Sequence, residues 1–236
     1  VAHVLAVDKT HAGFNGSGYA VRTANVFSPH ITGQTVLNVI GQFNAYNLLA
    51  VLATLLASGV SLSDAVHALS LIKPVPGRMQ QLGGGEHPLI VVDYAHTPDA
   101  LENVLTTIAK LRKGNETVIT VVGCGGGRDK TKRPIMAQVA CDLSNKVFFT
   151  SDNPRSEDPN EIIKDMEEGL TSAAKRKYIN IVDRKEAIKA AVSFAKSGDI
   201  ILIAGKGHEK YQDIKGVKHD FDDKQVLANQ FKELEK

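Results

Sequence analysis

The chain has 236 residues, of which 43% are hydrophobic and 23% charged, a balance that predicts a folded protein with a substantial core. Its formal net charge of +2 is too small to indicate a nucleic acid or an anionic membrane as partner, so we expect neither. No apolar run approaches the roughly 20 residues of a transmembrane helix. The two cysteines form neither a CxxC pair nor a disulfide framework, which favours a reducing cytoplasm. Because the chain starts at Val1 in a strand-like run, we expect it to be the C-terminal part of a longer protein.

The first third of the chain is predicted to form short strands and then two helices. A helix over residues 47–58 is almost wholly apolar and is expected to be buried. A Pro- and Gly-rich stretch over residues 73–85 indicates a domain boundary, which divides the chain into domains 1–78 and 79–236. The predicted strands lie at 4–7, 19–26 and 34–40, and the second helix at 62–72.

Beyond the boundary, strands and helices alternate. The strands are continuously apolar, which is typical of a parallel sheet covered by helices on both faces. Right-handed crossovers place the loops that follow the strands at one edge of the sheet, where open α/β sheets bind ligands. The predicted strands are 89–92, 117–122, 146–150, 179–182 and 200–204, and the predicted helices are 98–111, 134–143, 161–170, 185–195 and 224–234.

The loop after the first of these strands contains Asp93 and His96. A carboxylate at a strand end suits a pair of ribose hydroxyls, and the histidine follows at the start of a helix. Helix capping explains Thr97 and Pro98 of the same loop, but it explains neither Asp93 nor His96. We therefore predict a binding role for these two residues.

The next loop, residues 123–134, combines glycines with basic residues. It matches the dinucleotide fingerprint GxGxxG only in part, because Arg128 stands in the position of the third glycine. The glycines permit close approach of the backbone to an anion. The cations favour an anionic ligand or a reacting phosphate, with a solvated basic loop as the alternative; they are Arg128, Lys130, Lys132 and Arg133.

Two further loops supply groups that suit an amino acid. Asp152, Asn153 and Arg155 offer a carboxylate, an amide and a guanidinium, with Pro154 restricting the backbone between them. The alternative is an Asx-Pro turn with solvated charges. Glu209 follows the last strand in a Gly-Lys-Gly-His-Glu segment and can pair with an ammonium. The sequence contains no metal-binding pattern, no Walker A motif and no nucleophile motif, so the catalytic residues stay unassigned.

Taken together and in this order, six segments closely resemble the Mur ligases. The resemblance implies a cytoplasmic ATP-dependent amide ligase of peptidoglycan synthesis with a UDP-sugar domain, a central ATPase domain and a C-terminal Rossmann-like domain. This chain resembles the tail of the central ATPase domain followed by the whole Rossmann-like, mostly parallel third domain. The P-loop and the Mg²⁺ ligands are then expected in an N-terminal part, without which the chain is expected to be inactive. The six segments are 41–47, 75–79, 93–99, 123–134, 152–155 and 205–209.

The resemblance also implies roles for individual residues. Family members that carry Asp-Asn-Pro-Arg add meso-diaminopimelate to UDP-N-acetylmuramoyl-L-alanyl-D-glutamate, through an acyl phosphate formed with ATP. These two substrates are the partners expected here, and the protein is expected to be a monomer. The implied ATP contacts are Asn44, Arg78, Asp93 and His96, and the implied contacts to the amino acid are Arg128, Asp152, Asn153, Pro154, Arg155, Gly205 and Glu209.

Other interpretations stay open at this point. Lysine-adding relatives carry a different residue where Arg155 stands, but an L-lysine-adding homologue is still an alternative. A non-catalytic module that binds an amino acid or a nucleotide is another, favoured by the missing Walker A motif. A hydride-transferring enzyme is disfavoured by Arg128 in the glycine fingerprint. Asn44 could also serve only to cap a helix.

Overall fold

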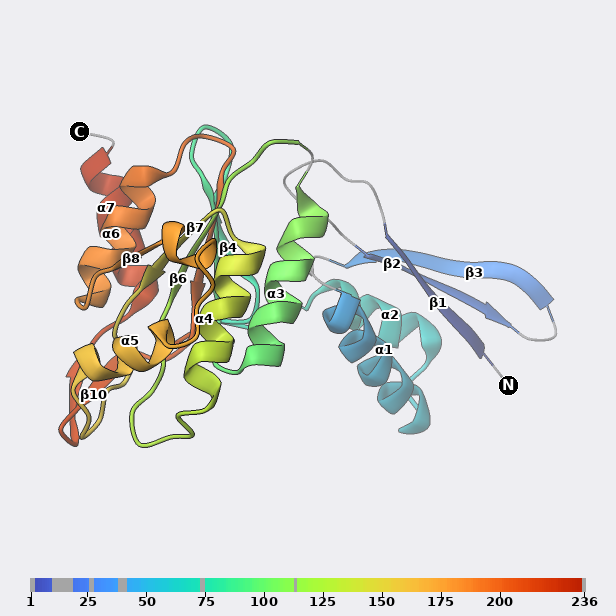
Figure 1. Ribbon diagram of the computed structural model, residues 1–236. Helices are drawn as coiled ribbons and strands as arrows, with labels where there is room; N and C mark the ends of the chain where they lie inside the picture. The colour runs from blue at the N-terminus through green and yellow to red at the C-terminus, as the bar shows by residue number, and fades with distance from the viewer. Residues whose placement is uncertain are drawn as a thin grey trace. The chain divides into compact units, whose positions relative to one another are not determined.

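The structure is a computed structural model that describes residues 3–9, 19–25, 28–37, 42–72, 75–112 and 114–234. The chain divides into two compact units, Val1–Val75 and Pro76–Lys236, each with its own sheet (Figure 1). Within the described residues, no helix is both long enough and apolar enough to cross a membrane.

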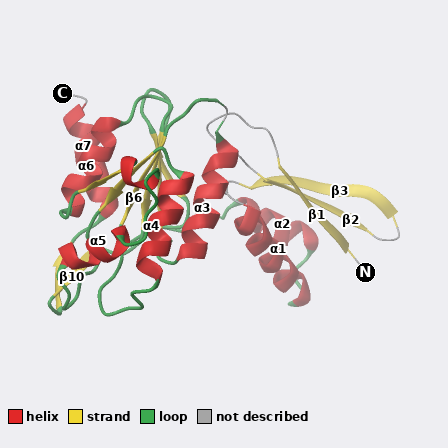
Figure 2. Ribbon diagram, in the orientation of Figure 1, coloured by secondary structure: helices red, strands yellow, loops and turns green. Residues whose placement is uncertain are grey.

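The first unit contains an antiparallel sheet and two helices. Its strands pair in the order β1-β2-β3, and the helices follow along the chain (Figure 2). The second helix begins at Ser61, whose hydroxyl accepts the backbone N–H of Asp64 at 3.1 Å, as expected of an N-cap. The elements are β1 (His3–Lys9), β2 (Tyr19–Asn25), β3 (Ser28–Leu37), α1 (Gln42–Ala57) and α2 (Leu62–Ser70).

Helix α1 is less buried than its sequence suggests. Leu48 and Leu52 are buried against Ala65 and Leu69 of α2. On another side of the same helix, however, 40% of Val51 is exposed. The prediction that this helix is buried is therefore wrong for part of its surface: the face toward α2 is buried, and Val51 lies outside that face.

The second unit is built on a six-stranded sheet with the order β4-β5-β9-β6-β7-β8. All neighbouring strands are parallel except β4, which runs antiparallel to β5. The predicted α/β fold with a mostly parallel sheet is confirmed. Strand β4 was not predicted, because it lies in the Gly-rich stretch where the sequence indicates a boundary. The strands are β4 (Gln80–Gly83), β5 (Leu89–Asp93), β6 (Val118–Val122), β7 (Lys146–Phe149), β8 (Tyr178–Asn180) and β9 (Ile200–Ala204).

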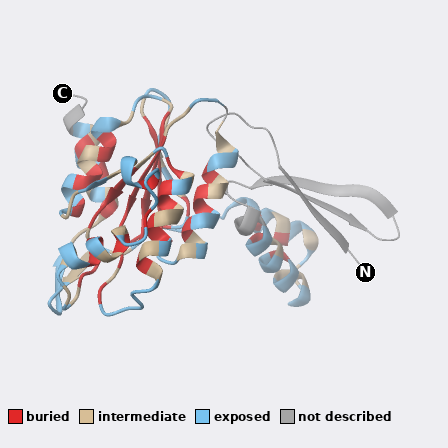
Figure 3. Ribbon diagram, viewed as in Figure 1, coloured by how far each residue is buried: buried red, intermediate tan, exposed pale blue. Residues whose placement is uncertain are grey.

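Helices cover both faces of this sheet, as the continuously apolar strands predict. Helices α3, α4 and α5 lie on one face, and α6 and α7 lie on the other (Figure 1). Every residue of β5, β6 and β9 is buried, and the strands form the buried centre of the unit (Figure 3). The helices are α3 (Pro98–Leu111), α4 (Lys132–Leu143), α5 (Pro159–Glu167), α6 (Arg184–Phe194) and α7 (Asp223–Leu234), with a 3₁₀ turn at Ala174–Arg176.

A hairpin after the last parallel strand adds to the loop edge of the sheet. Its strands, β10 (Tyr211–Ile214) and β11 (Val217–Asp220), pair antiparallel around a turn at Lys215 and Gly216, both with positive φ. The sequence analysis did not predict this hairpin. It matters for the site because Ile214 forms a parallel bridge with Arg155 of the loop after β7.

Candidate functional site

The loops that follow the parallel strands pack tightly against one another, and glycines make this packing possible. A Cβ atom on Gly123 would overlap the carbonyl oxygen of Thr150, and one on Gly126 would overlap that of Pro154. On the other side, a Cβ on Gly205 would lie 3.2 Å from Asp152 Oδ2. The glycines in the loops after β6 and β9 therefore let these loops approach the loop after β7.

Arg133 does not face a ligand, which corrects one of the sequence predictions. Its side chain is fully buried at the start of α4, and Nη1 lies 2.9 Å from Glu157 Oε2 and 2.6 Å from Asp165 Oδ2. Glu157 also accepts the backbone N–H of Gly127 at 2.6 Å. Hydrogen bonds from Arg133 and then Gly127 lower the pKa of Glu157 to about 2. Arg133 thus joins the glycine loop to α5 and adds no free charge to the site.

The other cations of the glycine loop differ in their surroundings. Lys130 lies 3.4 Å from Glu157 Oε2, and Lys132 donates to the carbonyl oxygen of His96 at 3.0 Å. Arg128 is exposed and forms no ion pair within the described part of the chain. Within the described residues, Arg128 and Lys132 are therefore the two of these four cations that no carboxylate pairs, and Arg128 is the more exposed of them.

The predicted amino-acid residues meet around a buried lysine. Nζ of Lys206 lies 3.0 Å from Asn153 Oδ1, 3.1 Å from Glu209 Oε2 and 3.4 Å from Asp152 Oδ1. Asn153 Nδ2 in turn donates to Glu209 Oε2 at 2.8 Å. Lys206 has no exposed surface, and Asp152 and Asn153 are buried. The loops after β7 and β9 thus form one hydrogen-bonded cluster, as the sequence predicts for their carboxylates.

Glu209 is held in its charged form within this cluster. Burial raises its pKa, but the hydrogen bonds from Asn153 and Lys206 outweigh this effect, so the pKa lies below its ordinary value. The hydroxyl of Tyr94 approaches the other carboxylate oxygen, Oε1, at 3.4 Å. An ionised carboxylate in which one oxygen accepts only a single long hydrogen bond suits an ammonium ligand.

Arg155 is fixed by its backbone as well as by its side chain. It has φ +51°, an unusual value for a residue other than glycine. Its N–H donates to the carbonyl oxygen of Asp213, and its own carbonyl oxygen accepts from Lys215, which holds the loop against β10. Nη1 donates to the carbonyl oxygen of Gly126 at 2.7 Å. The half-buried guanidinium of Arg155 therefore reaches from the loop after β7 to the glycine loop after β6.

Three of the predicted ATP contacts gather around Tyr94. The guanidinium of Arg78 lies 5.2 Å from the centre of the Tyr94 ring, and the His96 ring lies 4.6 Å from it. Asp93 is buried and accepts the backbone N–H of Met79 at 2.7 Å. Burial raises the pKa of Asp93, whereas the hydrogen bond from Met79 and the nearby Arg78 oppose that rise.

The fourth predicted ATP contact, Asn44, belongs to helix α1 of the first unit, and its side chain lies outside the described residues. No group of three or more His, Cys, Asp or Glu residues suited to a metal ion occurs in the part of the chain that the structure describes. Burial raises the pKa of the Cys124 thiol to about 12, so this cysteine is not an activated nucleophile.

Sequence reasoning missed two residues that build the site, Lys206 and Arg184. Lys206 was given no role, although its position three residues before Glu209 in a glycine loop was a signal. Arg184 carried no such signal. It is fully buried at the start of α6, binds both carboxylate oxygens of Asp223 at 2.8 Å, and donates to the carbonyl oxygen of Ala204 at 2.9 Å. It thereby anchors the end of β9, from which the Lys206 loop departs.

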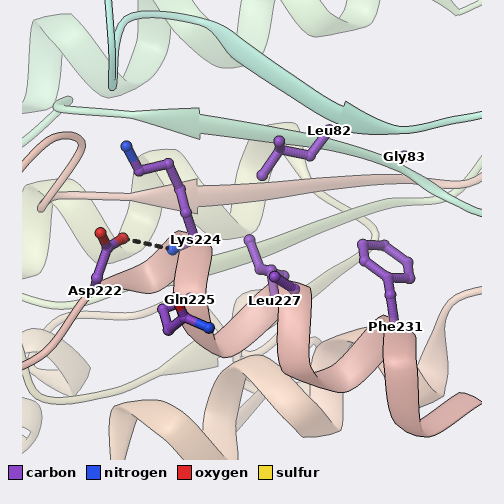
Figure 4. Close-up of a pocket in the computed structure, with 8 residues that line it drawn as sticks. Leu82, Gly83, Asp222, Lys224, Gln225, Leu227 and Phe231 are labelled. Carbon is purple, nitrogen blue, oxygen red and sulfur yellow. Dashed lines mark hydrogen bonds between the residues drawn. The ribbon is translucent and has the colours of Figure 1, made fainter.

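An open hollow of about 420 Å³ lies elsewhere, between β4 and α7 (Figure 4). Leu82 and Phe231 line it on opposite elements, and Lys224 donates its backbone N–H to Asp222 at 2.9 Å beside it. Gly83, which also lines it, pairs with the first residue of β5. The residues that line the hollow include none of the predicted site residues.

The fold and the loop cluster define an α/β domain that presents charged groups at the carboxyl edge of a parallel sheet. Residues 77–207 match the family described as "Mur ligase, glutamate ligase domain". This match covers more than half of the chain, so the chain belongs to the Mur ligase family. The resemblance found in the sequence is confirmed.

The chain is similar to curated proteins described as UDP-N-acetylmuramoyl-L-alanyl-D-glutamate–2,6-diaminopimelate ligase. The protein from Phocaeicola vulgatus is 56% identical over 192 residues, or 81% of this chain and 40% of its own length. The protein from Cytophaga hutchinsonii is 53% identical over 194 residues, or 82% and 40%. The protein from Geobacillus thermodenitrificans is 50% identical over 206 residues, or 87% and 42%. The chain thus spans about two fifths of the length of these relatives.

Solved structures show the same architecture. A structure titled as a UDP-N-acetylmuramoyl-L-alanyl-D-glutamate–2,6-diaminopimelate ligase superposes with a TM-score of 0.67 at 40% identity, covering 99% of this chain and 46% of that one. The MurF ligase of Thermotoga maritima, solved in complex with ADP, superposes with a TM-score of 0.63 over 99% of this chain and 47% of its own. At 19% identity, the second likeness shows the fold alone.

Proposed function

We propose that the chain is the C-terminal part of an ATP-dependent ligase that joins meso-diaminopimelate to UDP-N-acetylmuramoyl-L-alanyl-D-glutamate. The observation that carries this proposal is the cluster of Asp152, Asn153 and Glu209 around Lys206, with Arg155 beside it. Relatives described as this ligase, at 50–56% identity, support the choice of reaction.

The proposed site divides the charges of meso-diaminopimelate between two parts. Asp152 and Glu209 provide carboxylate oxygens for an ammonium group, and the guanidinium of Arg155 provides a planar pair of donors for a carboxylate. Arg128 is exposed on the neighbouring loop and supplies a second cation. L-Lysine lacks the second carboxylate, so it would leave a cation of this site unpaired beside its own ammonium.

Arg78, Asp93 and His96 are proposed to contact ATP, together with Asn44 from the first unit. In the proposed reaction, the D-glutamate carboxylate takes the γ-phosphoryl group of ATP and releases ADP. The amine of the diamino acid then attacks the acyl carbon, and phosphate leaves from the tetrahedral intermediate. In this scheme the described residues bind and orient the amine, while the P-loop and the Mg²⁺ ligands belong to the remainder of the proposed ligase.

The proposal is tested with the purified full-length ligase, UDP-N-acetylmuramoyl-L-alanyl-D-glutamate and meso-diaminopimelate, with ATP present or omitted. Mass spectrometry should detect the UDP-linked tripeptide only when ATP is present, with stoichiometric release of ADP and phosphate. Binding of meso-diaminopimelate without any amide formation would support the non-catalytic binding module instead.

A further inference from the structure

Lys206 is a fully buried cation at the carboxyl end of the parallel sheet. It follows β9 in a short loop whose flanking glycines, Gly205 and Gly207, both have positive φ. Its side chain has no exposed surface. Removing an ammonium from water is costly unless all of its N–H groups find acceptors, so a lysine in this position requires an explanation.

Each N–H donor of the Lys206 ammonium has an acceptor oxygen in the cluster around it. An ammonium has three N–H donors, and three side-chain oxygens lie within 3.4 Å of Nζ. They belong to Asp152, Asn153 and Glu209, which come from two loops separated by more than fifty residues. The ring of Tyr211 lies 5.5 Å from the same nitrogen. Lys206 therefore fixes the mutual positions of these three side chains, two of which are the acids proposed to bind the amino acid.

The same contacts determine which oxygens stay available for a ligand. Asn153 uses Oδ1 for Lys206 and for the backbone N–H of Asp213, and it uses Nδ2 for Glu209. Glu209 Oε2 accepts from both Asn153 and Lys206. Within the described residues, Asp152 Oδ2 accepts no hydrogen bond, and Glu209 Oε1 accepts only the long one from Tyr94. Asn153 thus belongs to the supporting frame, and one oxygen of each acid remains free.

We propose that Lys206 is a positioning residue for the amino-acid substrate, which holds Asp152 and Glu209 so that one oxygen of each receives the substrate ammonium. This inference rests on the proposed function and assigns a role within the same site. With Lys206 present, two carboxylates and one ammonium leave a net charge of −1, which matches one substrate ammonium. Without it, two carboxylates would share a buried site, and their mutual repulsion would favour protonation of one of them.

Other charged groups around Glu209 do not replace Lys206. Tyr94 approaches from the loop after β5 as a neutral hydroxyl, and Asp152 approaches from the loop after β7 as a second acid. Arg184 of α6 also acts on Glu209, but it is bound to Asp223 at 2.8 Å. Lys206 is therefore the cation in direct contact with both acids among the described residues.

The test compares Lys206→Met with wild type in the full-length ligase, by measuring kcat and KM for each substrate across pH. We expect the KM for meso-diaminopimelate to rise roughly 100-fold or more, with the KM for ATP within about threefold of wild type. The acidic limb of kcat/KM for meso-diaminopimelate should move to higher pH, because both acids lose their cation. If Lys206 only stabilised the loop, its replacement would not raise the KM for meso-diaminopimelate selectively over the KM for ATP. It would also leave the acidic limb of kcat/KM in place.

Lys177→Met is the matched control. Lys177 is half-buried and donates to the carbonyl oxygens of Cys141 at 2.6 Å and Ser144 at 3.1 Å, next to the amino end of β8. Its replacement should lower the Tm and leave the KM for meso-diaminopimelate and the acidic limb unchanged. If Lys206→Met behaves in this way as well, the positioning role is overturned.

Lys206→Arg keeps the positive charge but not the three-bond geometry, and it carries the test if Lys206→Met does not fold. It should raise the KM for meso-diaminopimelate about tenfold and keep the acidic limb of wild type. An unaltered KM for meso-diaminopimelate in Lys206→Arg would overturn the positioning role of Lys206 but not the proposed function. A folded wild-type enzyme that forms no amide with meso-diaminopimelate would instead overturn the proposed function and this inference with it.

Discussion

The guanidinium of Arg155 donates a 2.7 Å hydrogen bond to the carbonyl oxygen of Gly126, which ties the loop after β7 to the glycine loop after β6. The backbone of Arg155 has φ +51° and is held by hydrogen bonds to Asp213 and Lys215. Such a conformation costs about 1 kcal/mol or more and persists because the surrounding bonds enforce it. The direction of the Arg155 side chain is therefore set by its own loop, by the glycine loop after β6 and by the β10–β11 hairpin.

We predict that Arg155→Ala in the full-length ligase lowers kcat/KM for meso-diaminopimelate by roughly 100- to 1,000-fold. The reason is the loss of a two-donor partner for the second carboxylate, so the KM for ATP should change little. Steady-state kinetics with each substrate varied in turn measures both effects. Arg176→Ala, at an exposed arginine of the 3₁₀ turn, is the control and should match wild type. An unaltered choice of amino acid in Arg155→Ala would remove this residue from the specificity site.

Gly126→Ala should also impair meso-diaminopimelate use, although it removes no functional group. The new Cβ would overlap the carbonyl oxygen of Pro154, so the loops after β6 and β7 must separate and Arg155 must move. We expect kcat/KM for meso-diaminopimelate to fall at least about tenfold and the Tm to fall by several degrees. Gly114→Ala is the control, because its Cβ would meet nothing closer than 4.0 Å. Equal kinetics in the two variants would show that the loop contact is not needed.

The parallel core of the second unit could be predicted from sequence because its strands are continuously apolar and alternate with helices. Strand β9 was predicted with the bounds Ile200–Ala204 that the structure has. The exposed side of α1 could not be predicted, because an apolar helix does not reveal how much of it its neighbours cover. Strand β4 and the β10–β11 hairpin were missed because short edge strands in polar or Gly-rich segments carry little periodicity.

The candidate site was predictable where polar residues follow apolar strands, since topology alone brings those loops together. Topology does not predict, however, which acid or carbonyl group each buried cation contacts. Arg133 lies in the same basic segment as Arg128, yet it is buried against Glu157 and Asp165 from a later segment. Lys206 likewise meets its acceptors through the tertiary fold, and a single sequence does not encode such pairings in any local pattern.

Asp93→Ala is predicted to raise mainly the KM for ATP, through loss of a contact to the ribose hydroxyls. Because Asp93 also accepts the N–H of Met79 in a buried position, the variant should lose about 1–3 kcal/mol of folding stability as well. Kinetics below the Tm of the variant separates the two effects, and Asp99→Ala, at an exposed residue in the first turn of α3, is the control. A raised KM for meso-diaminopimelate with an unchanged KM for ATP would move Asp93 out of the nucleotide site.

The ion pair of Glu157 predicts a dependence of folding stability on pH. Its pKa in the folded protein is about 2, below the ordinary value of 4.5, so its ionised form is favoured by folding. The stabilisation is present above about pH 4.5 and is lost as the pH falls toward 2. The Tm difference between wild type and Glu157→Gln should therefore narrow over that range. Glu161→Gln, at an exposed residue of α5, should show no such change, and a constant difference for Glu157→Gln would contradict the assignment.

The most direct test of the central claim is a competition in the full-length ligase between equal concentrations of meso-diaminopimelate and L-lysine. UDP-N-acetylmuramoyl-L-alanyl-D-glutamate and ATP are supplied, and mass spectrometry measures the ratio of the two products. Leaving the Arg155 guanidinium unpaired beside the lysine ammonium costs about 3–5 kcal/mol. The account therefore predicts an excess of the diaminopimelate product of roughly two to four orders of magnitude. Comparable amounts of the two products, or an excess of the lysine product, would contradict it.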